Sequence, residues 1–342
     1  MHSASQAVLI PLRVAELFTS AKSFEANPII GNRRLNQWGL HVARVKAAYR
    51  LANARRRNLS RLVSAEDRAA FQRDGFIERP EFLPAADFKA LLAQVRAYRG
   101  TAHEIRQGDT LNRKIPVDPR LITAVPALRH MLESAAWRGL IRYVGARDGD
   151  PLVFLQSIFR RAGDGPDDPQ TMLHADTFHP AVKAWLFLTD VSEDAGPFLY
   201  VPGSHWLTAE RLRWERRMSL EACESANKET REGSFRIAAR DLPKLNLPQP
   251  RAFAVPANTL VVADTFGFHA RGPSARPSVR VEVWALGRRR PFMPWAWFDP
   301  WSSARLGQRA AMFWKLGYLL ESLGVNKSAS RRCDGLSAFD DA

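Results

Sequence analysis

The most constraining feature of this 342-residue chain is a series of short apolar segments, broken by glycine and proline, in its second half. The predicted strands are residues 152–160, 170–176, 182–191, 197–202, 252–256, 259–268 and 279–286. Short strands separated by such breaks are typical of an antiparallel sandwich or barrel. Helical patterns fill most of the first 145 residues, with helix starts near Asp67 and Pro84. The sequence therefore predicts a mainly β fold with flanking helices.

The segment LHADTFHP places His174 and Asp176 two residues apart in one predicted strand. Side chains two apart in a strand share a face, so both can bind one ion while Ala175 points away. His269 lies downstream, where an apolar strand enters a glycine-containing turn. Two imidazoles and one carboxylate hold ferrous iron on one side and leave the opposite positions open for cosubstrate and dioxygen. We therefore expect His174, Asp176 and His269 to be the metal ligands and catalytic centre of a non-haem iron oxygenase.

An arginine that suits a dicarboxylate cosubstrate follows the distal histidine by eleven residues. Arg280 lies inside SVRVEVWAL, where strand alternation puts it on the same face as Glu282 and Trp284. The planar guanidinium can donate two parallel charge-assisted hydrogen bonds to a carboxylate and stays protonated when desolvated. We expect Arg280 to bind the distal carboxylate of 2-oxoglutarate. Arg276, beside a serine in the segment RPS, is the alternative, but it is not embedded in a strand.

From about Asp67 to about Gly287 the sequence resembles the phytanoyl-CoA dioxygenase family. The resemblance begins with DRAAFQRDGFIERPEFLPAADFKALLAQV, a helix, a short strand and a second helix. It continues after the metal dyad with AWLFLTDVSEDAG and GPFLYVPGSH, which match the family's strand, acidic turn and Pro-Gly-Ser-His element. The resemblance implies a double-stranded β-helix, also called a jelly roll.

The resemblance also implies an Fe(II)- and 2-oxoglutarate-dependent dioxygenase with assigned residues. His174, Asp176 and His269 would hold Fe(II), and Arg280 would grip 2-oxoglutarate. Further implied cosubstrate contacts are Gln156 in PLVFLQSIFRR, Trp185 in KAWLF and Lys114 in RKIPVDP. The implied reaction consumes O2, releases succinate and CO2, and hydroxylates an unactivated C–H bond of a small organic substrate.

The chain carries a large excess of basic residues, with 50 Lys and Arg against 35 Asp and Glu, a net charge of +15 and a pI near 10.5. This charge favours an anionic partner, such as an acyl-containing or phosphorylated molecule or an acidic lipid. One predicted helix combines a stripe of Trp38, Val42, Val45, Tyr49 and Ala52 with Arg44, Lys46, Arg50, Arg55, Arg56 and Arg57. This helix either packs on the barrel with its arginines in solvent or lies on an anionic membrane surface. Nucleic acid is disfavoured because no recognised binding motif is present.

Three parts are expected: a basic helical extension over 1–64, a catalytic domain over 65–290, and a Trp-rich, basic helical extension over 291–342. A charged helical insertion at 207–235 is either a lid over the active site or a solvated helix. Cys223 and Cys333 offer no disulfide framework, and no signal peptide or long apolar run is found. We therefore expect a cytoplasmic protein, with peripheral contact at the inner membrane surface as a further option.

Two other functions remain open at this point. One is a non-catalytic jelly-roll module that docks on an anionic lipid surface through the basic extensions. The other is a cupin-like metal enzyme that uses no 2-oxoglutarate, in which Arg280 would be structural. Asp176 disfavours a halogenase, because a halogenase needs that coordination position for halide.

Overall fold

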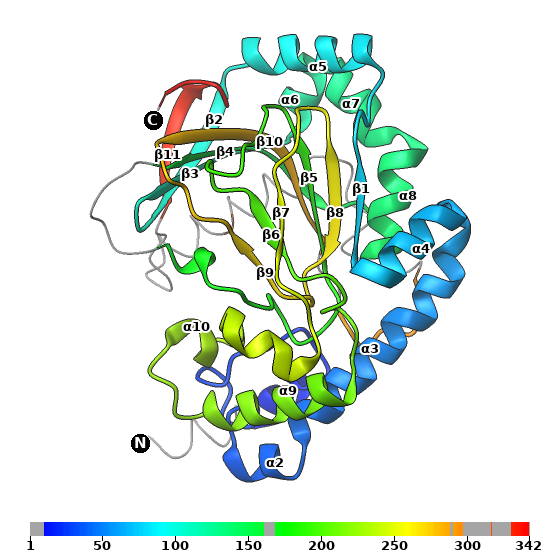
Figure 1. The fold of residues 1–342 in the computed structure, drawn as a ribbon, viewed down its shortest axis with the longest axis vertical. Coiled ribbons are helices and arrows are strands. Elements are labelled where there is room, and N and C mark those ends of the chain that lie inside the picture. Colours follow the sequence, from blue (N-terminus) through cyan, green and yellow to red (C-terminus); the bar gives the residue numbers. More distant parts are fainter. Residues whose placement is uncertain (1–9, 161–167, 288–289, 297–315, 317–329, 342) are drawn as a thin grey trace.

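Two antiparallel β-sheets face each other, with helices along the outer side of the larger sheet and below both sheets (Figure 1). The computed structural model describes residues 10–160, 168–287, 290–296, 316 and 330–341. The larger sheet has the strand order β1-β8-β5-β10-β4-β3-β2-β11, and the smaller has the order β7-β6-β9. The predicted mainly β, jelly-roll architecture with flanking helices is confirmed.

The elements have the following bounds. The strands are β1 (Phe76–Arg79), β2 (Gly100–Gln107), β3 (Thr110–Pro116), β4 (Leu152–Arg160), β5 (Val182–Phe187), β6 (Phe198–Tyr200), β7 (Arg251–Phe253), β8 (Leu260–Asp264), β9 (His269–Arg271), β10 (Ser278–Gly287) and β11 (Ser330–Leu336). The α-helices are α2 (Arg33–Gln37), α3 (Leu40–Leu59), α4 (Ala65–Asp74), α5 (Ala85–Ala97), α6 (Pro119–Ala124), α7 (Pro126–Glu133), α8 (Ala135–Val144), α9 (Ala209–Glu221) and α10 (Lys228–Arg231). The 3₁₀ helices are η1 (Ser60–Leu62), η2 (Pro169–Thr171) and η3 (Ala239–Leu245).

Strand alternation gives the larger sheet two chemically different faces. On the outer face, Val281 and Val283 of β10 join a large apolar core with helices α5 to α8. On the inner face, Trp185 of β5 and Trp284 of β10 pack with Phe198 of β6 in the space between the two sheets. The polar inward positions of the same strands are therefore held between a rigid apolar layer and an aromatic layer.

The strand predicted at 170–176 is wrong as a regular strand. Its start is η2, where Asp168 accepts the backbone N–H of Gln170, a local bond that competes with strand pairing. His174 keeps only isolated antiparallel bridges, to Arg236 and His269.

The predicted strands 182–191 and 259–268 end early, at Phe187 and Asp264. The second ends there because the Asp264 carboxylate accepts the backbone N–H groups of Ala181 and Phe266, which closes a turn. His269 consequently begins a separate short strand, β9, in the smaller sheet.

Two regions that were predicted to be helical, the first 145 residues and the C-terminal extension, also contain β-strands. The β2–β3 hairpin lies within the region predicted as helical, and its turn uses Gly108 at φ 58°. The C-terminal extension, predicted as helical, ends in strand β11, which pairs with β2 at the edge of the larger sheet. Most of this extension, including Trp297 and Trp301, lies outside the described residues.

Helix α3 packs through its arginines, so the prediction that they lie in solvent is wrong for three of them. Arg44, Arg55 and Arg56 are buried and donate to backbone carbonyls, for example from Arg44 to Ala21 at 2.7 Å and from Arg55 to Ala146 at 2.8 Å. Trp38, predicted to be on the apolar stripe, is 81% exposed. In the part of the chain that the structure describes, no helix combines the length and apolar character needed to cross a bilayer.

The predicted insertion at 207–235 contains α9 and α10. Trp214 and Met218 of α9 pack in a core with Leu173, Ala175 and Phe268, which lie next to the predicted metal ligands. No described residue of 207–235 lines the cavity described below. In this structure the insertion supports the back of the site and does not cover its mouth.

Candidate metal centre

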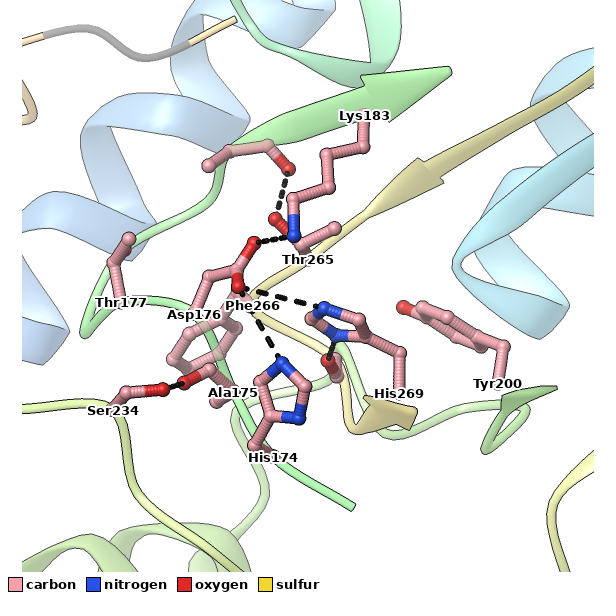
Figure 2. A network of polar contacts seen from close by, with 12 residues as sticks. His174, Ala175, Asp176, Thr177, Lys183, Tyr200, Ser234, Thr265, Phe266 and His269 are labelled. Atoms are coloured by element: carbon pink, nitrogen blue, oxygen red, sulfur yellow. Dashed lines mark hydrogen bonds and ion pairs between the residues drawn. The ribbon is translucent and has the colours of Figure 1, made fainter. Parts of the chain in front are cut away.

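Three predicted ligands, from two segments far apart in the sequence, meet at one buried point. Asp176 Oδ1 lies 3.7 Å from His174 Nε2 and 3.6 Å from His269 Nε2 (Figure 2). Bonds from a transition metal to nitrogen or carboxylate oxygen are about 2.0–2.2 Å, so one ion can contact each pair across these gaps. Among the described residues, these three form the group of His, Cys, Asp or Glu side chains that could hold a metal.

The backbone fixes both imidazoles with the same nitrogen facing the centre. His174 Nδ1 lies 2.8 Å from the Met172 carbonyl, and His269 Nδ1 lies 3.0 Å from the Gly267 carbonyl. A carbonyl only accepts, so each Nδ1 carries the proton and each Nε2 presents a lone pair. His269 Nε2 is buried and has no hydrogen-bond partner in the described structure. A metal ion would satisfy this atom, so the donor set fits the predicted ion.

Asp176 is held at three atoms besides the one that faces the histidines. Its backbone N–H donates to the Thr265 carbonyl at 3.0 Å, and its own carbonyl accepts from Lys22 Nζ at 2.7 Å. Its Oδ2 pairs with Lys183 Nζ at 2.7 Å, as Figure 2 shows. These contacts leave Oδ1 as the carboxylate oxygen that is directed at the two imidazoles.

Burial and nearby charges keep His174 and Asp176 in the protonation states that a metal needs. Burial, followed by the charge of His269, lowers the pKa of His174 to about 4, so its ring is neutral at neutral pH. Burial alone would raise the pKa of Asp176, but the ammonium of Lys183 and the nearby imidazoles hold it well below its usual value. His174 is therefore a neutral imidazole and Asp176 a carboxylate, the forms in which each can bind a metal.

All the predicted cosubstrate residues line the same cavity as the three ligands. This cavity has a volume of about 340 Å³ and lies between the two sheets. Its lining includes Lys114, Gln156, Trp185 and Arg280. They come from four neighbouring strands, β3, β4, β5 and β10, and the register pairs Gln156 with both Lys114 and Glu282. Arg276 does not line the cavity; it is exposed and pairs with Asp194 at 2.6 Å.

Arg280 is buried and held in place by neighbouring acceptors. Its Nη1 donates to the Gly196 carbonyl at 2.7 Å, and its Nε lies 2.9 Å from Glu282 Oε2. The other oxygen of Glu282 accepts from Gln156 Nε2 at 2.5 Å. The guanidinium is therefore oriented by a buried carboxylate while it lines the cavity.

Sequence reasoning missed two cations in the cavity wall. Lys183 lies two residues before Trp185, so strand alternation alone would have placed it on the inward face. Arg271 lies two residues after His269, has a side chain that is 10% exposed, and pairs with Asp168. Its carboxylate partner is far away in sequence, and no local pattern predicts that pairing.

Comparisons with known proteins give the following matches. Residues 71–240 match the family model described as phytanoyl-CoA dioxygenase (PhyH). No curated protein sequence matches the chain. Among solved structures, the epimerase SnoN in complex with Fe3+, alpha-ketoglutarate and nogalamycin RO is 18% identical, with 74% of this chain and 97% of that chain covered and a TM-score of 0.44. HygX from Streptomyces hygroscopicus with nickel, 2-oxoglutarate and hygromycin B is 14% identical, with 72% and 94% covered and a TM-score of 0.39. EctD from S. alaskensis with bound Fe is 17% identical, with 72% and 84% covered and a TM-score of 0.38.

Proposed function

Because this chain belongs to the phytanoyl-CoA dioxygenase family, we propose that it is an Fe(II)- and 2-oxoglutarate-dependent dioxygenase that hydroxylates a C–H bond of a small organic substrate. The observation that carries the proposal is the convergence of His174, Asp176 and His269 in a buried cavity that Arg280 also lines. When bound, Fe(II) with 2-oxoglutarate and O2 supplies the oxidising power to cleave an unactivated C–H bond, with succinate and CO2 as coproducts.

The protein's own contribution is to bind, orient and exclude water. Arg280 would bind the distal carboxylate of 2-oxoglutarate, and the Glu282 and Gln156 side chains behind it would keep its fork in one orientation. Lys114, whose ammonium lies 4.1 Å from the centre of the Trp284 ring, adds positive charge to the same wall. The packed rings of Trp185, Phe198 and Trp284 would keep water from the far side of the site.

The charge of the cavity supports an anionic substrate as well as a dianionic cosubstrate. Lys183, Arg271 and Arg280 each pair with one buried acid, whereas Lys114 has no carboxylate within ion-pairing distance among the described residues. A cavity with excess positive charge concentrates anions. The alternative of a lipid-docking module has less support, because Arg44, Arg55 and Arg56 are buried and cannot face a membrane.

Anaerobic titration with Fe(II) and then 2-oxoglutarate tests this function. We expect the weak visible charge-transfer band of the chelate to appear with the wild type and to be absent with His174→Ala. We expect succinate to form when O2 is admitted. A wild-type protein that binds neither Fe(II) nor 2-oxoglutarate would exclude the proposal. Fe(II) binding with no effect of Arg280→Ala on cosubstrate binding would instead favour a metal enzyme that uses no 2-oxoglutarate.

A further inference from the structure

A second cavity, of about 450 Å³, is lined by residues of helices α3, α4 and α8 together with His205 and Trp206. None of its lining residues lines the metal-centre cavity. The volume is within the range of about 300–1,000 Å³ that is common for small-molecule sites.

Helices α3 and α4 turn polar and aromatic side chains toward this cavity. Tyr49, Asn53 and Arg57 are four residues apart along α3, and Arg68 and Phe71 are three apart along α4, so each set forms one helical stripe. A stripe that only serves to pack two helices is ordinarily apolar. Because these stripes contain arginine, asparagine and aromatic side chains, they resemble a binding surface more than a packing surface.

The cavity wall carries positive charge that the protein does not neutralise. Arg57 is exposed, and its guanidinium has no hydrogen-bond or ion-pair partner in the described structure. Arg68 donates only to the backbone carbonyls of Ser60 and Val63, at 2.9 and 2.8 Å. Arg56, by contrast, pairs with Asp264 at 2.6 Å. No Asp or Glu is among the described residues that line the cavity, so two guanidinium charges remain for a ligand.

Two polar side chains in the wall also lack hydrogen-bond partners among the described residues. Tyr143 is 4% exposed, and its hydroxyl makes no hydrogen bond within the described residues. His205 is 3% exposed, and neither ring nitrogen has a partner side chain there. Burial, followed by the charges of Arg56 and Arg211, lowers the pKa of His205 to about 3, so its ring is a neutral donor and acceptor. Buried polar groups nearly always have a partner, so the two ring nitrogens of His205 predict a polar ligand or ordered water.

We propose that this cavity binds a small aromatic anion, specifically a phosphate monoester on a flat ring. Arg57 and Arg68 bind the phosphate, because guanidinium forks match its oxygens, and the Tyr143 hydroxyl donates to a further oxygen. The ring lies against Phe71 and Trp206, whose indole N–H is fixed by a 2.7 Å bond to the Gln72 carbonyl. This site is independent of iron and 2-oxoglutarate.

Calorimetric titration of the metal-free full-length protein with phenyl phosphate tests the proposal. We expect saturable binding that is at least about tenfold tighter than that of inorganic phosphate, since the ring adds burial of apolar surface. Benzoate, with one charge and two oxygens, should bind more weakly than phenyl phosphate, and phenol should not bind measurably. Arg57→Ala should weaken phenyl phosphate binding about tenfold or more, and Tyr143→Phe roughly fivefold.

Arg61→Ala is the matched control, because Arg61 is an exposed arginine four residues from Arg57 that does not line the cavity. It should leave binding unchanged. Cooperative thermal unfolding would confirm that each variant folds, which is expected for Arg57→Ala because that side chain has no partner to lose. Failure of the wild type to saturate, or equal effects of Arg57→Ala and Arg61→Ala, would overturn the proposal and indicate a cavity that holds only water.

Discussion

The two faces of the larger sheet carry different kinds of side chain on the same strands. Along β10, Val281 and Val283 point outward into an apolar core, while Arg280 and Glu282 point inward to the cavity. Outward residues gain stability from burial, whereas inward residues are buried charges that cost desolvation and need partners. The outer face therefore contributes most to folding stability, and the inner face supplies the side chains of the candidate site. Substitutions on the two faces should therefore separate stability from binding.

Removal of a metal ligand should have the largest effect and should be confined to binding. His174→Ala deletes one of three donors, so we expect Fe(II) affinity to fall by more than about 100-fold, beyond the loss typical of residues that only support a ligand. Unfolding in urea should change little, because His174 makes one side-chain hydrogen bond, to the Met172 carbonyl. Anaerobic metal titration and urea unfolding measure the two effects. If His174→Ala kept the metal affinity of the wild type, His174, Asp176 and His269 would not be the metal centre.

Lys183→Met should give the next largest effect, again on the inner face. The lysine fixes Asp176 Oδ2 at 2.7 Å, so its loss frees the carboxylate to rotate away from the geometry in Figure 2. Residues that orient metal ligands typically contribute about 10–100-fold to metal affinity, and we expect a loss in this range. Lys183→Arg should restore part of the affinity because it keeps the charge. Fe(II) affinity within twofold of the wild type in Lys183→Met would show that the backbone contacts of Asp176 alone position it.

The regular strands of the site were predictable from sequence, and its irregular segment was not. The alternation in β10 places Arg280 on the inward face, the family resemblance implies Gln156 of β4, and the structure brings both to the cavity. His174 and Asp176 also reach the cavity, but not by strand alternation. Their segment is held by long-range bonds such as Asp176 N–H to the Thr265 carbonyl and Lys22 to the Asp176 carbonyl. Such contacts depend on which distant segments pack together, which a local pattern does not encode.

The burial of arginines on α3 is a second feature that sequence reasoning could not supply. A helical stripe analysis treats arginine as a solvent-facing residue, because a guanidinium is costly to bury without partners. Here the partners are backbone carbonyls from distant turns, at Ala21, Ala146 and Val144, and the carboxylate of Asp264. The pattern of charges along the helix was visible, but their acceptors were not.

Val283→Ala tests the outer face, with the opposite expected signature. Val283 is fully buried in the core formed with helices α5 to α8, so truncation loses apolar burial and leaves a cavity. We expect the free energy of unfolding to fall by roughly 1.5 kcal/mol, or about tenfold in the folding equilibrium. Below the unfolding transition, the affinities for Fe(II) and 2-oxoglutarate should equal those of the wild type. A parallel loss of metal affinity would show that the two faces are coupled through the strand.

The smallest effect expected is the contribution of Lys114 to the pH dependence of folding stability and of 2-oxoglutarate binding. Burial, followed by the charges of Lys183 and Arg271, lowers the pKa of Lys114 from 10.5 to about 7, and Glu282 opposes this only in part. Below pH 7 the lysine is charged in both the folded and unfolded states, so the cost of burying the charge is fully present. Between pH 7 and about 10.5 only the unfolded state is charged, so this cost is relieved as pH rises.

Binding of 2-oxoglutarate should have the opposite trend, because the charge that attracts the dianion is lost through the same range. From pH 6 to pH 8.5 we expect the affinity of the metal-loaded wild type to fall roughly fivefold, about the contribution of one hydrogen bond from a charged donor in a partly hydrated site. Lys114→Met should bind more weakly at pH 6 and show a flatter profile. Anaerobic titrations at several pH values measure both curves. An identical slope in the variant would assign the pH dependence to other groups and leave Lys114 with a packing role against Trp284.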